Sequence, residues 1–159
     1  MIPERQDLAE QLPPALDSAL PGAVTGVVAS RDELYLKIDH TRLLEVCAHL
    51  RDEERWSFNF LAFISGVDWL EREPRFEVVY HLRSLVHNFR TGLKVDVPDE
   101  TTALPSVSGI WKTADWFERE VFDLYGIRFT DHPDLRRIMM PDDWEGHPYR
   151  KDYPLEGKG

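Results

Sequence analysis

The chain has 159 residues, of which 42% are hydrophobic and 30% are charged, and its formal net charge is −10. Its length fits one domain, and its composition is typical of a folded globular protein rather than a disordered chain. The acidic balance argues against a nucleic-acid-binding protein, which normally carries a basic patch. No apolar run approaches the roughly 18 residues of a membrane span, and the charged start lacks the apolar core of a secretory signal, so we expect neither.

The first predicted element is a helix over residues 4–20. Leucine recurs there at every fourth position, which places one apolar stripe on a helix: Leu8, Leu12, Leu16 and Leu20. Proline lacks the N–H group that an internal helical position needs. We therefore expect Pro13 and Pro14 to split this segment into two shorter helices.

Two strands and a second helix follow. Residues 22–30 and 33–39 have strand-like composition and alternation, with a turn between them. Residues 41–54 form a helical pattern, with Asp39 or Thr41 as its N-cap. Its apolar face includes Cys47, the only cysteine, which we interpret as a small core residue. One thiol cannot hold an iron–sulfur cluster, which takes about four thiolates.

The remaining core elements are three strands and one helix. Residues 58–70, 75–85 and 88–98 alternate as strands, residues 105–111 form a short turn, and residues 113–126 form the clearest helix. Thr113 stands at its N-cap and Gly126 just past its end. The pattern predicts an α+β fold, with a single antiparallel or mixed sheet packed by helices. Residues 1–126 form this domain, and residues 127–159 form an extended C-terminal segment, called the tail below.

One carboxylate of the last helix stands at the edge of its apolar face. On a helical projection Glu120 lies between Trp116 and Leu124, whereas Glu118, Arg119 and Asp123 fall outside that face. A partly desolvated carboxylate needs a cation, and the tail offers three arginines at positions 136, 137 and 150. We predict that Glu120 fastens the tail to the domain. Two alternatives are a solvent-facing carboxylate and the acid of a stand-alone enzyme in which His132 is the base. Arg119 and Asp123 lie four residues apart, at a spacing at which the two side chains can pair.

The tail contains four prolines and no regular apolar period, yet it is rich in aromatic residues and arginine. Trp144, Tyr149 and Tyr153 are residue types that anchor interfaces. We expect the first part of the tail to pack on its own domain and the last part to reach a partner. His132 and His147 fit no known zinc spacing, so we favour hydrogen bonds to neighbouring backbone over a metal site. Nucleotide-binding glycine loops are absent from the sequence.

The segment EREVFDLYGIRFTDHPDLRRIMMP, residues 118–141, resembles the signature of the 30 kDa subunit of respiratory complex I. The matching positions are Glu118, Arg119, Glu120, Asp123, Leu124, Tyr125, His132, Arg136, Ile138 and Met139. The likeness continues through Leu155 and covers most of the chain from about residue 25. Many members continue beyond this point, so we expect either a smaller tail interface for this chain or compensation by another subunit.

The resemblance implies a non-catalytic peripheral-arm subunit of a proton-translocating NADH:quinone oxidoreductase. FMN and iron–sulfur clusters are then expected in partner subunits, with no catalytic, cofactor or metal residue in this chain. The tail is expected to run along the 49 kDa subunit, and the complex would hold the chain at the cytoplasmic side of the membrane. The expected contact residues are Glu118, Arg119, Glu120, His132, Arg136, Arg137, Trp144, Arg150, Lys151 and Asp152. Related subunits occur in membrane-bound hydrogenases and ferredoxin-dependent quinone reductases, and the sequence leaves that choice open.

Overall fold

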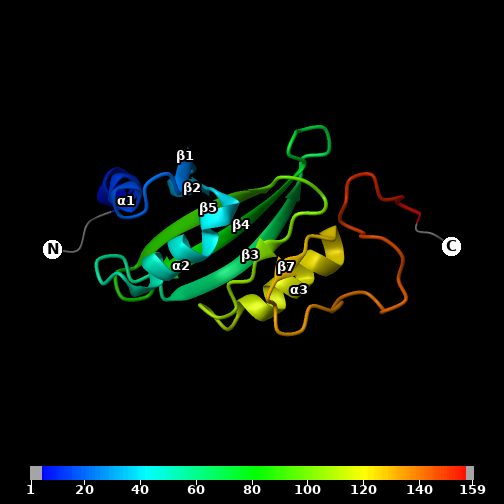
Figure 1. Ribbon diagram of the computed structural model, residues 1–159. Helices are drawn as coiled ribbons and strands as arrows, with labels where there is room; N and C mark the ends of the chain where they lie inside the picture. The colour runs from blue at the N-terminus through cyan, green and yellow to red at the C-terminus, as the bar shows by residue number, and fades with distance from the viewer. Residues whose placement is uncertain (1–4, 157–159) are drawn as a thin grey trace.

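The strands form one five-stranded mixed sheet, as predicted (Figure 1). The computed structural model describes residues 5–156. Residue 4 of the predicted first helix and residues 157–159 of the tail therefore lie outside the described residues. The sheet has the order β1-β2-β5-β4-β3, in which β2 and β5 are parallel and the other neighbours are antiparallel. Its strands are β1 (Val24–Ser30), β2 (Glu33–Ile38), β3 (Phe60–Asp68), β4 (Phe76–Ser84) and β5 (Phe89–Val97).

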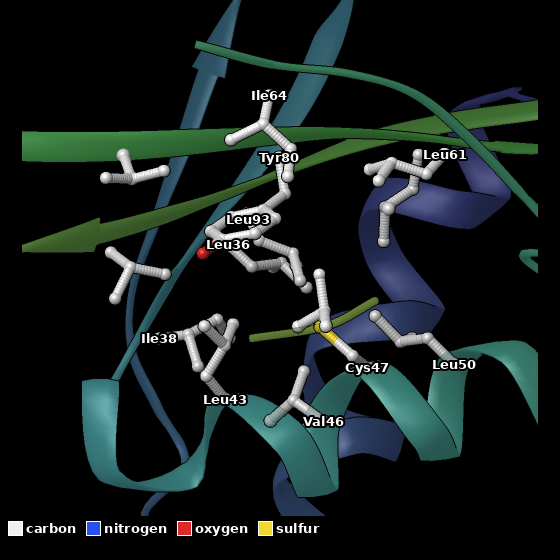
Figure 2. Packing of buried hydrophobic residues seen from close by; sticks show 14 of the residues in the cluster. Leu36, Ile38, Leu43, Val46, Cys47, Leu50, Leu61, Ile64, Tyr80 and Leu93 are labelled. Carbon is white, nitrogen blue, oxygen red and sulfur yellow. The ribbon is translucent and has the colours of Figure 1, made fainter. Parts of the chain in front are cut away.

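One face of the sheet carries the core. The alternation of β2 buries Leu34, Leu36 and Ile38 there. Helix α2 (Leu43–Asp52) directs Cys47 toward this face together with Leu43, Val46 and Leu50, which confirms the prediction for Cys47 (Figure 2). The turn η1 (His40–Arg42) precedes α2, and the carboxylate of its N-cap Asp39 accepts the amide of Thr41.

Helix α1 (Arg5–Ala19) runs without interruption through Pro13 and Pro14, so the predicted split is wrong. Its buried stripe gives the physical reason. Leu8, Leu12 and Leu16 all lie in the core cluster. Burying a leucine side chain stabilises by about 1.5–3 kcal/mol, and three such side chains offset the hydrogen bonds that the prolines remove.

Helix α3 (Ala114–Tyr125) packs on β3 at the end of the sheet opposite α1 (Figure 1). Gly126 ends it in the left-handed conformation, with φ of 80°, as its position predicted. Thr113 occupies the N-cap position but makes no capping hydrogen bond, because its hydroxyl donates to the Leu61 carbonyl at 3.4 Å. The capping role predicted for Thr113 is therefore wrong.

The chain stays in the core for a few residues after α3. Ile127 and Phe129 are buried, and the short strands β6 (Leu104–Pro105) and β7 (Phe129–Thr130) pair in parallel. From residue 131 to residue 156 the tail has no helix or strand and passes around the end of α3 (Figure 1). Within residues 5–156, none of the helices is long and apolar enough to cross a membrane.

Candidate functional site

Asp123 is the centre of the junction between α3 and the tail. Asp123 is fully buried, with 0% of its surface exposed. Its carboxylate accepts four hydrogen bonds from consecutive tail residues: Arg137 Nη1 at 2.8 Å and the amides of Ile138 at 3.1 Å, Met139 at 2.7 Å and Met140 at 2.8 Å. Burial alone would raise the pKa of Asp123, but these donors outweigh it and lower the pKa. Three of the four donors at Asp123 are thus backbone amides of the tail.

The C-terminal end of α3 is covered by the next part of the tail. Carbonyls at a helix end have no partner within the helix. Here the carbonyls of residues 123, 124 and 125 accept from His147 Nδ1 at 2.9 Å, Tyr149 N at 3.0 Å and Arg150 Nε at 2.7 Å, respectively. Gly126 lies beneath this layer, where an added Cβ would come within 2.7 Å of the His147 ring and 2.8 Å of Arg150. Only glycine fits the tail this closely.

A second buried carboxylate, Asp68 at the end of β3, binds the last part of the described tail. Arg75 donates to both of its oxygens at 2.8 Å, and the amides of Leu70 and Lys151 donate at 2.8 Å. Hydrogen bonds from Arg75 and from the two amides hold the pKa of Asp68 well below its usual range. Arg75 also pairs with Asp152 at 2.8 Å, so the tail is tied to the sheet as far as Asp152.

His132 is enclosed where the tail leaves β7. Its Nε2 donates to the Asp115 carbonyl at 3.0 Å and lies 3.1 Å from the Asp115 carboxylate, while its Nδ1 accepts the Asp134 amide at 3.0 Å. The predicted backbone hydrogen bonds of His132 and His147 are therefore confirmed. Both ring nitrogens of His132 are occupied, and no hydrogen bond or ion pair joins His132 to Glu120 within residues 5–156.

Arg119 contacts the tail rather than Asp123. Its guanidinium donates to the carbonyls of Arg136 at 3.2 Å and Arg137 at 3.3 Å, and it lies over the Trp116 ring. The pair of Arg119 with Asp123 that this spacing allows does not form, because Arg137 occupies that position. The Arg136 side chain is exposed and pairs with Asp134 at 2.9 Å.

The helical projection placed the wrong glutamate of α3 against the core: Glu118 is the buried one, and Glu120 is not. Glu118 is fully buried, and its Oε1 accepts the Val107 amide at 2.7 Å. Its Oε2 is buried without a hydrogen-bond partner in the described part of the chain. Burial raises the pKa of Glu118 to about 7. Glu120 is only half-buried and, among the described residues, has no arginine partner, so the prediction that it fastens the tail is wrong.

The remaining predicted tail residues lie against the domain or in the tail itself. Trp144 is half-buried, and its Nε1 has no acceptor within the described chain. Arg150 lies over the Phe76 ring and 3.7 Å from Glu100. Lys151 contributes its amide, and Asp152 its carboxylate, to the group around Asp68. The sequence therefore found most of the tail contacts but missed Asp68 and Asp123 as their acceptors.

This junction attaches the tail to α3 and to the sheet. The carboxylates of Asp123 and Asp68 accept hydrogen bonds from the tail, and His132 and His147 are hydrogen-bonded to backbone carbonyls. Across residues 5–156 no group of three or more His, Cys, Asp or Glu side chains is placed to hold a metal ion. What the junction presents outward is the apolar side chains of the tail, with Met139 and Tyr149 61% and 58% exposed.

Comparison with known proteins gives consistent matches. The family model for the respiratory-chain NADH dehydrogenase 30 kDa subunit matches residues 36–159. An NADH-quinone oxidoreductase subunit of Roseiflexus sp. (strain RS-1) is 50% identical over 140 residues, which cover 88% of this chain and 80% of the relative. The equally named subunit of Paramagnetospirillum magneticum is also 50% identical, over 87% of this chain and 70% of the relative.

Two solved structures have a similar fold. A trypsin-resistant fragment of Nqo5 is 36% identical and superposes with a TM-score of 0.67, over 78% of this chain and 98% of the fragment. A chain of the membrane-bound sulfane sulfur reductase, an archaeal respiratory membrane complex, gives a TM-score of 0.77 over 92% of this chain and 85% of that chain. The second is 22% identical, so it supports the fold alone.

Proposed function

This chain belongs to the family of the respiratory-chain NADH dehydrogenase 30 kDa subunit, and we propose that it scaffolds the peripheral arm of a proton-translocating NADH:quinone oxidoreductase. In this role the chain carries no redox centre. FMN and iron–sulfur clusters are held by its partners, and electrons pass through them from NADH to quinone. Its task is to keep those partners in register at the cytoplasmic side of the membrane, because electron transfer requires short and constant distances between centres.

The observation that carries this proposal is the way the tail is held. Asp123 and Asp68 bind tail amides, so part of the attachment uses backbone and does not occupy the side chains of Met139 and Tyr149. Met139 and Tyr149 consequently project from an ordered segment. A segment that is ordered before it binds loses less conformational entropy on association. We propose that these side chains contact the 49 kDa subunit.

The test is a full-length chain with Met139→Ser and Tyr149→Ser, expressed in cells that lack their own 30 kDa subunit. The isolated variant should melt close to the parent protein, because both side chains are largely exposed. It should nevertheless fail to enter the complex, and NADH:quinone reductase activity of the membranes should fall. The matched control is Leu44→Ser, which removes an exposed apolar side chain of α2. Full assembly and activity with the tail variant would refute the proposal.

The same membranes distinguish the electron donor. Membranes that contain the parent chain should oxidise NADH with added quinone, and this activity should be lost with the tail variant. Quinone reduction by reduced ferredoxin with no response to NADH would instead indicate the ferredoxin-dependent class of complex. The isolated chain should show no visible absorption, and a stoichiometric flavin or cluster would contradict the scaffold role.

A further inference from the structure

The face of the sheet opposite α2 carries a group of exposed and half-buried residues from strands β3, β4 and β5. Cross-strand pairing places Phe63 beside His81, and Phe60 beside Arg83, which is in turn paired with Arg90. His81 is paired with Gly92 of β5, and Lys94, two residues after Gly92, lies on the same face. The buried side chains of the helices all belong to the core on the other side of the sheet. We therefore call the surface that contains Phe60, Phe63, His81, Arg83, Arg90 and Lys94 the open face.

A β-bulge gives the open face its aromatic part. The register of β3 against β4 shifts between Leu61 and Phe63, so that Phe60 and Phe63 reach the same face although three positions separate them. They are 41% and 44% exposed. Phe63 stacks on the His81 ring with the centroids 3.9 Å apart. Burial lowers the pKa of His81, so this ring is neutral at pH 7 and extends the apolar surface.

Beside the two phenylalanines lies a cavity of about 160 Å³, with Arg83, Arg90 and one carboxylate, that of Glu33, in its lining. The Glu33 carboxylate accepts the Tyr35 hydroxyl at 2.8 Å. Cavities that bind cofactors and metabolites usually measure about 300–1,000 Å³. This one suits a single side chain of a partner. A shallow site with aromatic residues and arginine at its margin is typical of a protein–protein contact.

The open face brings four cations together, although the net charge of the chain is −10. Lys37 lies beside Lys94 on the neighbouring strand and joins Arg83, Arg90 and Lys94. The carboxylates on the same face are those of Glu33, which accepts the Tyr35 hydroxyl, and of Glu77 and Asp96, which pair with Arg72. Within residues 5–156 none of these four cations forms an ion pair. Arg83 donates only to the Asn88 side chain at 3.3 Å, and Lys94 lies over the Tyr35 ring. Unpaired cations around an apolar centre are complementary to an acidic partner.

We propose that the open face is a second docking surface, which binds an acidic protein segment with one apolar or aromatic side chain in the cavity between Phe60, Phe63 and the two arginines. Two copies of this face would bring like charges together, so the occupant is not another copy of this chain. Single-stranded nucleic acid also stacks on aromatic sheet faces, but a net charge of −10 repels phosphates, and four cations are a small footprint. The inference rests on the proposed function only in that the acidic segment belongs to a neighbouring subunit of the same complex.

The first experiment identifies the occupant in the assembled complex. Phe63 is replaced by the photo-reactive amino acid benzoylphenylalanine in the full-length chain, the complex is purified from membranes and irradiated, and cross-linked peptides are sequenced. The expected product is one peptide of a neighbouring subunit in which Asp or Glu residues flank an apolar side chain. No cross-link in a fully assembled complex, or a cross-link to nucleic acid, to lipid or to a peptide without carboxylates, would overturn the inference.

The second experiment tests the charges. Arg90 is exposed, so Arg90→Glu should leave the isolated protein folded, and Arg83→Glu with Arg90→Glu gives the stronger change. Reversing these charges is expected to reduce incorporation of the chain into the complex about tenfold when parent and variant chains compete, and added salt should diminish the difference. The control, Lys112→Glu with Arg128→Glu, makes the same charge change at two exposed positions outside the open face.

The two docking surfaces can fail independently. If the Met139→Ser, Tyr149→Ser chain is excluded from the complex while the Arg90→Glu chain assembles as well as the control, the open face is not a docking surface and the scaffold role stands. If both variants assemble normally, both proposals fail. If Arg90→Glu reduces incorporation with unchanged melting and the control does not, the open face binds an acidic partner.

Discussion

Replacing Asp123 by asparagine should release the tail from α3 without unfolding the domain. The carboxylate accepts from Arg137 and from the amides of Ile138, Met139 and Met140. Asparagine can keep one acceptor oxygen for the three amides, but its NH₂ group then faces the Arg137 guanidinium. The variant loses one charge-assisted hydrogen bond and turns three others into neutral ones.

The size of the effect follows from these contacts. A hydrogen bond to a charged group contributes about 1.5–3 kcal/mol, and a neutral one about half as much. Losing one and weakening three therefore costs about 4–7 kcal/mol. Each 1.4 kcal/mol is about a factor of ten, so local opening of the tail should become roughly a thousand to a hundred thousand times more frequent. The cost falls on the closed state of the tail, so a domain with roughly 5–15 kcal/mol of stability remains folded with the tail released.

The assay is hydrogen exchange of the amides of residues 138–140, together with trypsin cleavage after Arg136 and Arg137. Both should accelerate strongly in Asp123→Asn, while the amides of β4 and β5 keep their protection. The control is Asp142→Asn, which neutralises an exposed carboxylate of the same tail. Exchange of the three amides within twofold of the parent protein would show that Asp123 does not hold the tail.

Three further changes test the neighbouring parts of the junction. Gly126→Ala should cost more than Gly22→Ala in urea unfolding, because both positions have positive φ but only at Gly126 does a Cβ collide with His147. Glu118→Gln should flatten the pH dependence of stability and gain up to about 3 kcal/mol at pH 8, since burial moves the pKa of Glu118 from 4.5 to about 7, and urea unfolding at pH 5 and pH 8 measures this. Glu120→Ala should shift the melting temperature by no more than about 2 °C, because the carboxylate is half-buried and holds no arginine.

The sheet and the two later helices were predictable because their local patterns agree with their packing. Strands β2, β4 and β5 alternate, and α3 ends at a glycine that can take a positive φ. The continuity of α1 was not predictable, since local propensity and tertiary packing disagree at Pro13 and Pro14. Only the buried positions of the leucines in the folded core decide that conflict.

The sequence indicated several tail residues that contact the domain, but not the buried carboxylates of Asp68 and Asp123 that accept their hydrogen bonds. A helical projection assumes that a helix has one buried face, whereas α3 is enclosed by β3, by the segment around Val107 and by the tail. Glu118 and Asp123 are buried by the second and third of these, while Trp116, placed near the apolar face, is 61% exposed. Phe122 is apolar and also falls outside that face on the helical projection, which is a sequence signal of a second covering surface.

The number of donors at each buried carboxylate decides how the protein responds to pH. Asp123 and Asp68 are surrounded by donors, their pKa values are lowered, and the stability they add is present above about pH 4 and lost in acid. Glu118 has one amide donor and an oxygen without a partner, so burial raises its pKa. The folded state then holds a proton that the unfolded state releases, and this contribution decreases as pH rises from 4.5 to about 7. The two carboxylates that hold the tail therefore keep their charge around neutral pH, whereas the Glu118 carboxyl, which contacts Val107, titrates there.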